Sequence, residues 1–273
     1  MTVFARLANR ARFVLYGVYA RLFRCRTIYT NSGQQFRITT GTEHETFRAF
    51  TFFTKEPETL AWIDAFAADS VLFDVGANIG IYSLYTAATK TRARVFSFEP
   101  DSQSFASLCK NIAINGFENV TPFPFALSNE VCLGSLHVST LAAGAGAAAL
   151  GEDYSHMNIH GRDVARQGVF VASLDHLVFE LDLPFPHYIK IDVDGIEKKI
   201  LEGGRRVLRD GRLKGLLVEL QYETDHDIAE LHRSLRSGGM EMIATSKWEA
   251  TYRSGLRSRN FIFGRAELSN RER

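Results

Sequence analysis

The stretch VLFDVGANIG at residues 71–80 decides the fold. The mainly apolar run 71–75 ends at Gly76, and a segment of helical character follows over about 79–89. A short buried strand that turns through glycine into a helix is the usual opening unit of an α/β sheet. Glycine at such a turn lets a ligand reach the backbone N–H groups at the helix start. We therefore expect a ligand-binding loop here.

The alternation of strands and helices continues along the chain, which predicts an α/β protein with a mostly parallel, Rossmann-like sheet. Two prolines in the third expected strand favour a short or edge position for it. The last two strands are expected to form an antiparallel pair. Further strands are expected at 94–98, 120–127, 134–140, 169–172, 187–193, 213–220, 240–244 and 260–264, and helices at about 102–114, 173–177, 195–208 and 225–237.

An acidic residue follows the second expected strand, and its position indicates which class of ligand the loop binds. Glu99 follows Asp74 by 25 residues, where a carboxylate can reach the two hydroxyls of a ribose bound across the first loop. Dinucleotide-binding loops need a middle glycine, and this chain has Asn78 there. A leading carboxylate also repels phosphate and suits a cationic ligand. S-adenosyl-L-methionine, a nucleoside with a sulfonium and an ammonium, is therefore the predicted cofactor.

The run KIDVDGIE at 190–197 places three carboxylates at the end of another strand and the start of a helix. Ligands of open α/β sheets bind at such strand ends. Strand alternation puts Asp192 and Asp194 on the same side, facing the first loop if the two strands are neighbours. The alternative is that Asp194 and Glu197 only cap the helix.

Taken together, these motifs resemble the FkbM family of S-adenosylmethionine-dependent methyltransferases over about 56–220. The resemblance implies a class I fold with a seven-stranded sheet whose last strand is antiparallel. It also implies methyl transfer to a hydroxyl oxygen of a sugar, glycan or natural-product acceptor. The family more often has Glu at the position of Asp194. The resemblance rests on DVGANIG (74–80), FEP (98–100), NxxxNG (111–116), FALS (125–128), SLDHL (173–177), IKIDVDGIEKKILEGG (189–204) and LLVEL (216–220).

Two groups of site residues are expected. In the catalytic group, Asp192 or Asp194 takes the proton of the acceptor hydroxyl or orients the acceptor, and Glu197 and Lys190 tune or anchor the site. Asp192, Asp194 and Glu219 could also hold Mg²⁺, but we expect a site without a metal. The cofactor group comprises Asp74, Gly76, Ala77, Asn78, Gly80, Glu99, Pro100, Ala126, Leu127 and Ser128.

Charge is distributed unevenly along the 273 residues. The net charge is only +1, which argues against nucleic-acid binding, yet residues 1–42 hold seven arginines and no acid. We expect a basic extension at 1–55, a methyltransferase domain at 56–265 with an insertion at about 129–172, and a basic tail at 266–273. An N-terminal helix would either pack on its own domain or dock on an anionic membrane surface or a partner. Three scattered cysteines indicate a reducing, cytoplasmic setting.

Other functions compete with methyl transfer. A non-catalytic module would keep the nucleoside pocket alone, and an NAD-dependent oxidoreductase would use a similar sheet. A nucleic-acid methyltransferase is disfavoured because the chain has neither an N/D-P-P-Y segment after the fourth strand nor a Pro-Cys nucleophile. A small-molecule or glycan acceptor is what the resemblance to the FkbM family implies.

Overall fold

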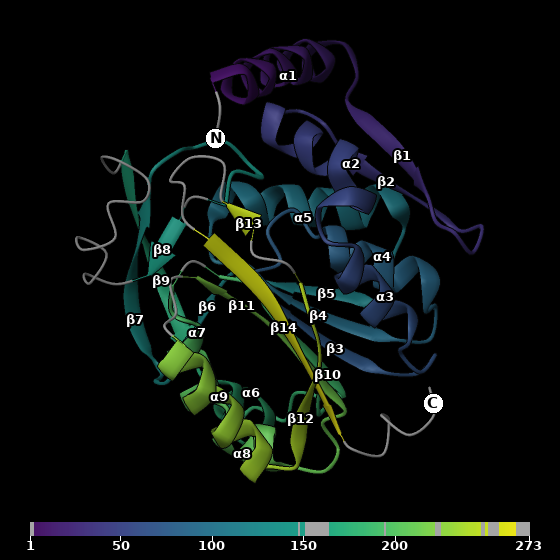
Figure 1. Cartoon of the computed structure of the whole chain (residues 1–273). Coiled ribbons are helices and arrows are strands. Elements are labelled where there is room, and N and C mark those ends of the chain that lie inside the picture. The colour runs from purple at the N-terminus through teal and green to yellow at the C-terminus, as the bar shows by residue number, and fades with distance from the viewer. Residues whose placement is uncertain are drawn as a thin grey trace.

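A twisted central sheet organises the chain (Figure 1). The computed structural model describes residues 3–146, 148–150, 164–193, 195–221, 225–246, 249–250 and 257–265. Neighbouring strands from β11 to β5 are parallel, and β14 is antiparallel to both of its neighbours. This arrangement confirms the predicted fold class, including the antiparallel last strand. The strand order is β12 (Met240–Thr245), β14 (Arg257–Arg265), β11 (Gly215–Gln221), β10 (Tyr188–Ile191), β3 (Val71–Val75), β4 (Arg94–Phe98) and β5 (Val120–Phe123), and the short β13 (Glu249–Ala250) pairs with β14.

Helices cover both faces of this sheet (Figure 1). Side chains alternate along each strand, so Leu72 and Leu217 pack toward one helical layer while Phe73 and Val218 pack toward the other. Burial on both faces explains why these strands are apolar runs rather than alternating ones. One layer holds α2 (Glu43–Lys55), α3 (Pro57–Asp64), α4 (Ile81–Thr89) and α5 (Ser102–Asn115), and the other α6 (Leu174–Phe179), α7 (Glu197–Glu202), α8 (Arg205–Arg209) and α9 (Asp225–Ser237).

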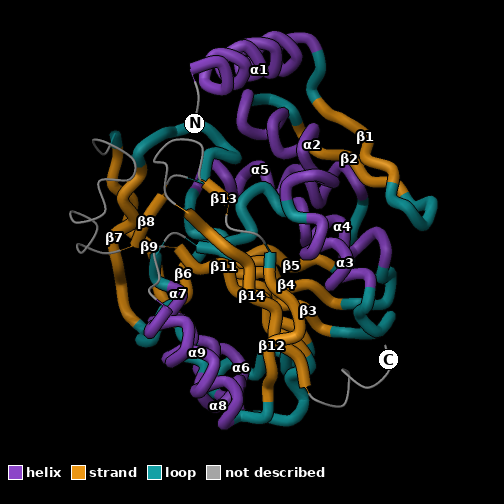
Figure 2. The backbone as a smooth tube through the Cα atoms, in the orientation of Figure 1, coloured by secondary structure: helices purple, strands orange, loops and turns teal. Residues whose placement is uncertain are grey.

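The expected insertion supplies three of the four strands of a second, smaller sheet, which Figure 2 shows apart from the central one. Its strand order is β6 (Ala126–Leu127), β9 (Ala165–Ala172), β7 (Cys132–Val138) and β8 (Ala148–Leu150). The single strand predicted at 120–127 is wrong, because the chain divides into β5 and β6 around Pro124, which has no N–H for a sheet ladder. The edge position predicted for the first part is correct, since β5 ends the central sheet.

The prediction of one continuous helix at 195–208 is also wrong. It is interrupted at Gly203 and Gly204, which separate α7 from α8. A Cβ on Gly203 would lie 2.2 Å from the carbonyl oxygen of Ser128, so the chain passes too close to another backbone for any side chain. By contrast, the boundaries predicted for α9 are confirmed. The helix predicted at about 102–114 is α5, with Asp101 as its N-cap and Gly116 as its C-cap.

Residues 3–55 pack on the same face of the sheet as α3 and α4. They form α1 (Val3–Leu22), the antiparallel pair β1 (Cys25–Tyr29) and β2 (Gln35–Thr39), and α2. Phe36 and Phe52 are buried there together with Tyr82 and Tyr85 of α4. Within the described ranges, no helix combines the length and the apolar character needed to cross a membrane.

Candidate active site

The loop between β3 and α4 is folded tightly around Asp74. This side chain is 1% exposed, and its Oδ2 accepts a hydrogen bond from the Ser83 hydroxyl at 2.5 Å. Its Oδ1 is buried and has no hydrogen-bond partner among the described residues. Burial raises the pKa of Asp74, although Lys190 and the Ser83 hydrogen bond oppose this shift. An unpartnered oxygen beneath a glycine loop is the kind of atom that a ligand's donor group satisfies.

Gly76 makes the floor of this loop. Its φ is +77°, and a Cβ there would lie 1.9 Å from the carbonyl oxygen of Asp192 and 2.8 Å from its carbonyl carbon. The amide of Asp192 also donates to the carbonyl of Val75 at 3.0 Å. The backbones after β3 and β10 are therefore in direct contact, as expected if these strands are neighbours. The absence of a side chain at residue 76 is what allows the contact.

Glu99, at the end of β4, holds the other side of the loop. Its carboxylate accepts hydrogen bonds from the backbone N–H groups of Asn78 at 2.7 Å and of Asp101 at 2.8 Å. Burial raises the pKa of Glu99 to about 8 despite these two hydrogen bonds; the Asp101 carboxylate adds to the shift and Arg48 opposes it. The loop and the acid that the sequence pairs are thus in contact.

A buried ion pair lies beside this loop at the end of β10. Lys190 is in register with Asp74 on the adjacent strand, and its Nζ donates to Asp192 Oδ2 at 2.6 Å. The Lys190 side chain is 2% exposed and that of Asp192 is 25% exposed, so only the carboxylate is open to a substrate. Burial disfavours both charges, but the mutual attraction raises the pKa of Lys190 and lowers that of Asp192.

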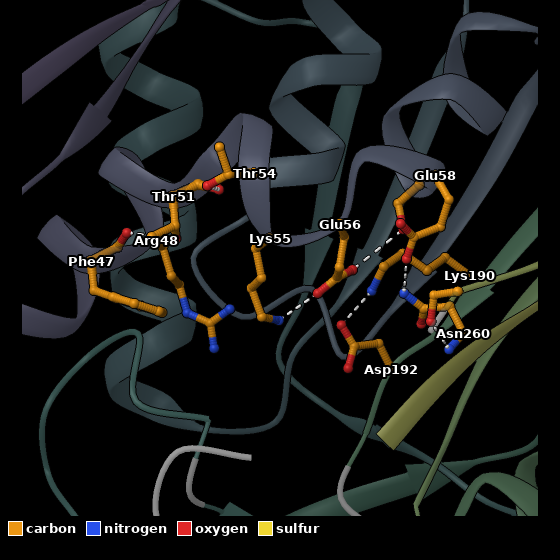
Figure 3. Close-up of polar contacts among 12 residues, drawn as sticks. Phe47, Arg48, Thr51, Thr54, Lys55, Glu56, Glu58, Lys190, Asp192 and Asn260 are labelled. Atoms are coloured by element: carbon orange, nitrogen blue, oxygen red, sulfur yellow. Dashed lines mark hydrogen bonds and ion pairs between the residues drawn. The ribbon is translucent and has the colours of Figure 1, made fainter. Parts of the chain in front are cut away.

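Three further side chains reach this ion pair from α2, α4 and the junction between α2 and α3. Lys55 donates to Glu56 Oε1, and Figure 3 shows both pointing toward Lys190 and Asp192. Glu56 is 3% exposed, and Lys55 and Lys190 keep its pKa low against burial and the charge of Asp192. The Lys190 Nζ lies 4.9 Å from the ring centroid of Tyr82. A hydrogen bond to Glu56 and burial together hold the pKa of the Tyr82 hydroxyl high.

Glu219 of β11 completes what we call the charged cluster: Lys55, Glu56, Tyr82, Lys190, Asp192 and Glu219. Burial raises the pKa of Glu219 well above its ordinary value, and the charge of Asp192 and a hydrogen bond with it add to this. Glu219 is therefore protonated where Asp192 is ionised, and the two carboxyls share one proton. The cluster presents an ionised, partly open carboxylate held between two lysines, beside the glycine loop.

A comparison with known protein families identifies the family to which this site belongs. The family described as the methyltransferase FkbM domain matches residues 74–242, which include the loop, the strand ends and most of the cluster. The chain belongs to the FkbM family. The family predicted from the sequence motifs is thereby confirmed, and it gives no support to an oxidoreductase or to a non-catalytic module.

Relatives of this FkbM domain include the hexuronic acid methyltransferase AglP of Haloferax volcanii, which is 29% identical over 167 residues. That match covers 60% of this chain and 61% of AglP, so the chain spans about three fifths of its relative. Among solved structures, an FkbM methyltransferase from Methylobacillus flagellatus KT has a TM-score of 0.49 and 15% identity, covering 93% of this chain and 59% of that one.

Not all predicted site residues of the FkbM domain meet at the loop. Asp74, Gly76, Asn78, Glu99 and Lys190 gather there with Ala77, Gly80 and Asp192. Asp194 lies outside the described residues. Glu197 is 3% exposed and accepts a hydrogen bond from the backbone N–H of Gly195 at 3.1 Å, an interaction of the helix start.

The segment from Ala126 to Ser128 belongs to the smaller sheet. Ala126 and Leu127 pair with β9, and the Ser128 hydroxyl donates to Asn129. The carbonyl of Pro100, also assigned to the cofactor, accepts a hydrogen bond from the side chain of Gln167 at 2.6 Å. Hydrogen bonds therefore connect these residues with β9. Among the described residues, no hydrogen bond connects them with the charged cluster.

Sequence reasoning missed Lys55, Glu56 and Tyr82. Lys55 and Glu56 come just before Pro57, the first residue of α3, and nothing in their spacing connects them with a strand 135 residues later. Glu219 was considered only as a metal ligand. Within the described ranges, no three metal-binding side chains come together in a way that could hold an ion, and Asp192 Oδ2 is occupied by Lys190.

The Gly/Ala-rich segment before β8 also contacts the site. Arg48 Nε donates to the carbonyl of Gly144 at 2.6 Å, and the Thr42 hydroxyl donates to that of Ala143 at 2.8 Å. A Cβ on Gly146 would lie 3.0 Å from an Arg48 terminal amine and 3.5 Å from the Asn78 side-chain amide. This part of the insertion therefore contacts both α2 and the glycine loop, as a ligand-binding loop would.

Proposed function

We propose that the protein transfers the methyl group of S-adenosyl-L-methionine to a hydroxyl oxygen of a sugar. The observation that carries this proposal is the direct contact between the glycine loop at Gly76 and the backbone of Asp192, whose carboxylate is ionised and open. A nucleoside loop and a proton acceptor are thereby held together on one rigid sheet edge. Alignment of the acceptor oxygen with the methyl carbon accounts for much of the acceleration of such a transfer.

The residues present fit the proposed cofactor. Gly76 has no side chain that would keep a ligand from the loop. The buried Oδ1 of Asp74 has no hydrogen-bond donor among the described residues. Glu99 can accept hydrogen bonds from ribose hydroxyls. S-adenosyl-L-methionine would supply an electrophilic methyl group on a sulfonium. In this assignment Asp74, Gly76, Asn78, Gly80 and Glu99 hold it.

Asp192 acts on the acceptor. An alcohol attacks poorly while it keeps its proton, so a carboxylate within hydrogen-bond reach orients it and takes the proton. The low pKa of Asp192 suits this role because the oxygen becomes strongly acidic as its new bond to carbon forms. Lys190 keeps Asp192 ionised, and the protonated Glu219 fixes its orientation. Glu197 accepts a hydrogen bond from Gly195 at the start of α7 and is assigned no role in proton transfer.

Transfer of a labelled methyl group tests the proposed function. We expect the protein to label a hexuronic-acid oligosaccharide with S-adenosyl-L-methionine as donor, and the label to be stable to base as an ether is. Label that base releases as methanol would show an ester on a carboxylate instead. Binding of S-adenosylhomocysteine without labelling of any glycan fraction would contradict the proposed enzyme activity.

The proposed acceptor class rests on Arg48, a cation that lies beside Lys55 of the charged cluster. The two terminal amines of Arg48 have no hydrogen-bond partner among the described residues, and Figure 3 shows the guanidinium on the same side as the Lys55 ammonium. A Cβ on Gly146 would lie 3.0 Å from an Arg48 terminal amine and 3.5 Å from the Asn78 amide, so the guanidinium lies beside the glycine loop. A guanidinium in that place suits a carboxylate. We propose a uronic acid as acceptor, the class named in the description of AglP.

Arg48→Ala tests this assignment. We expect it to raise the KM for a uronic-acid acceptor by about tenfold or more, because a charge-assisted hydrogen bond is worth about 1.5–3 kcal/mol. The KM for the corresponding neutral sugar should stay unchanged, and Arg48→Lys should recover part of the loss. Arg206→Ala, at an arginine 59% exposed and paired with Glu180, is the control. Weaker binding of S-adenosylhomocysteine with unchanged acceptor preference would assign Arg48 to the cofactor and overturn the proposal.

The raised pKa of Glu99 predicts a pH-dependent cofactor affinity. Protons and ribose hydroxyls compete for the same carboxylate, and with a pKa of about 8 the group is mostly protonated at pH 6. The affinity for S-adenosylhomocysteine should therefore rise by about tenfold per pH unit from 6 to 8 and level off above. Calorimetry across this range measures it, with Glu99→Gln giving weaker and pH-independent binding. Equal wild-type affinity at pH 6 and 8 would be incompatible with this role.

A further inference from the structure

Two tyrosines of helix α1 pack against the protein. The ring of Tyr16 lies 6.0 Å from that of Phe47 and 5.7 Å from that of Phe50, and the ring of Tyr19 lies 5.0 Å from that of Phe50. All these contacts are with α2. Figure 1 shows α1 on the outside of α2 at one end of the molecule. The position of the helix is thus fixed by aromatic packing, and its opposite face points outward.

The outward face is apolar. Residues 14, 15, 18 and 22 follow a helical spacing that places them on one side, away from Tyr16 and Tyr19. Their large exposed fractions show that no described residue covers this side, and Phe23 extends the surface beyond the helix end. We call these five residues the α1 patch: Val14 (68% exposed), Leu15 (66%), Val18 (48%), Leu22 (70%) and Phe23 (52%).

Arginines border the α1 patch. Arg12 precedes Leu15 by about one turn, Arg21 follows Val18 by about one turn, Arg24 follows directly after Phe23, and all three are exposed. No acidic residue occurs in the first 42 positions. Arg26 is bound differently, since its guanidinium stacks 3.8 Å from the Phe50 ring centroid and donates to the carbonyl of Ala49. Glu43 of α2 reaches α1 at Gly17, where a Cβ would lie 3.7 Å from its Oε2, so the border is mainly cationic. An apolar strip with such a border matches the boundary between acyl chains and anionic headgroups.

We infer that α1 docks this protein on an anionic lipid surface, with the α1 patch in the acyl boundary and Arg12, Arg21 and Arg24 at the headgroups. This inference does not depend on the proposed enzyme activity. A second copy of the chain would cover an apolar strip, but two copies facing each other through this patch would bring two cationic borders together. Charge complementarity therefore favours lipid. Because α2 carries α1 on one side and Arg48 and Lys55 on the other, docking would hold the site near the surface.

Co-sedimentation of the full chain with vesicles tests the inference. We expect at least tenfold tighter binding to vesicles of phosphatidylcholine with 30% phosphatidylglycerol than to phosphatidylcholine alone. Replacing Val14, Leu15, Val18 and Leu22 by serine should weaken binding to the anionic vesicles by tenfold or more. The triple variant Arg12→Glu, Arg21→Glu, Arg24→Glu should do the same, and raised salt should weaken the wild type.

Val131→Ser with Leu133→Ser is the matched control, because these exposed apolar side chains (45% and 86%) lie at the start of β7 in the smaller sheet. This control should bind vesicles as the wild type does, and thermal unfolding should show that every variant is folded. Unchanged vesicle binding by the arginine variant would overturn the inference, even if the serine variant fails to fold. A dimer that the serine substitutions dissociate, with vesicle binding unaffected, would assign the patch to a second copy instead.

Discussion

Asp192→Asn is expected to lower kcat by about 10²–10⁴-fold, the range that a positioned proton acceptor contributes. The amide has nearly the same shape but cannot take the acceptor's proton. It also leaves Lys190 without its anionic partner at 2.6 Å. Affinity for S-adenosylhomocysteine should change by less than threefold, because the backbone of Asp192, which contacts Gly76, is unaltered. Turnover under saturating donor and acceptor measures the first effect, and calorimetry measures the second.

Two matched variants make this result specific. Asp210→Asn breaks a similar ion pair, with Arg212 at 2.8 Å, far from the loop, and should leave kcat unchanged. Glu219→Gln keeps a hydrogen-bond donor toward Asp192 and should cost less than about tenfold, since Glu219 donates rather than accepts in the shared-proton state. If Glu219→Gln were as damaging as Asp192→Asn, the roles of the two carboxyls would be reversed. Unaltered turnover in Asp192→Asn would remove this residue from the mechanism.

Gly76→Ala is expected to cause the largest loss of cofactor binding and of stability. A Cβ at 1.9 Å from the Asp192 carbonyl oxygen requires the two strand ends to move apart, and the φ of +77° adds strain for any L-residue. Strain and overpacking together amount to about 3–5 kcal/mol. For a chain of this size we expect the Tm to fall by about 10 °C. Affinity for S-adenosylhomocysteine should fall by at least tenfold.

Gly33→Ala separates the two causes. Gly33 has a similar φ of +87°, but a Cβ there meets nothing within 4 Å. This variant should lose only about 1–2 kcal/mol from backbone strain and keep its cofactor affinity. A Gly76→Ala protein with the stability and affinity of Gly33→Ala would show that the contact between the loop and Asp192 is not required.

Local patterns predicted much of the fold because each depends on near neighbours in the chain. The run 71–75 is apolar throughout because both faces of its strand are covered, and Asp101 and Gly116 limit α5 through their own cap geometry. The two wrong boundaries have non-local causes. Ser128 comes against Gly203 and thereby interrupts a helix, and β6 leaves the central sheet to pair with β9.

The amino-acid sequence alone was enough to predict the sheet, the glycine loop, the proximity of Glu99 to that loop and the membership of the FkbM family. Each of these depends on short segments with fixed spacing. The tertiary structure decided which charges act together. Glu56, Lys190 and Glu219 come from three distant segments, and their pKa values depend on burial and on each other rather than on sequence neighbours. The two lysines lower the pKa of Asp192, whereas burial and the like charge of Asp192 raise the pKa of Glu219, and no pattern in the chain specifies these contacts.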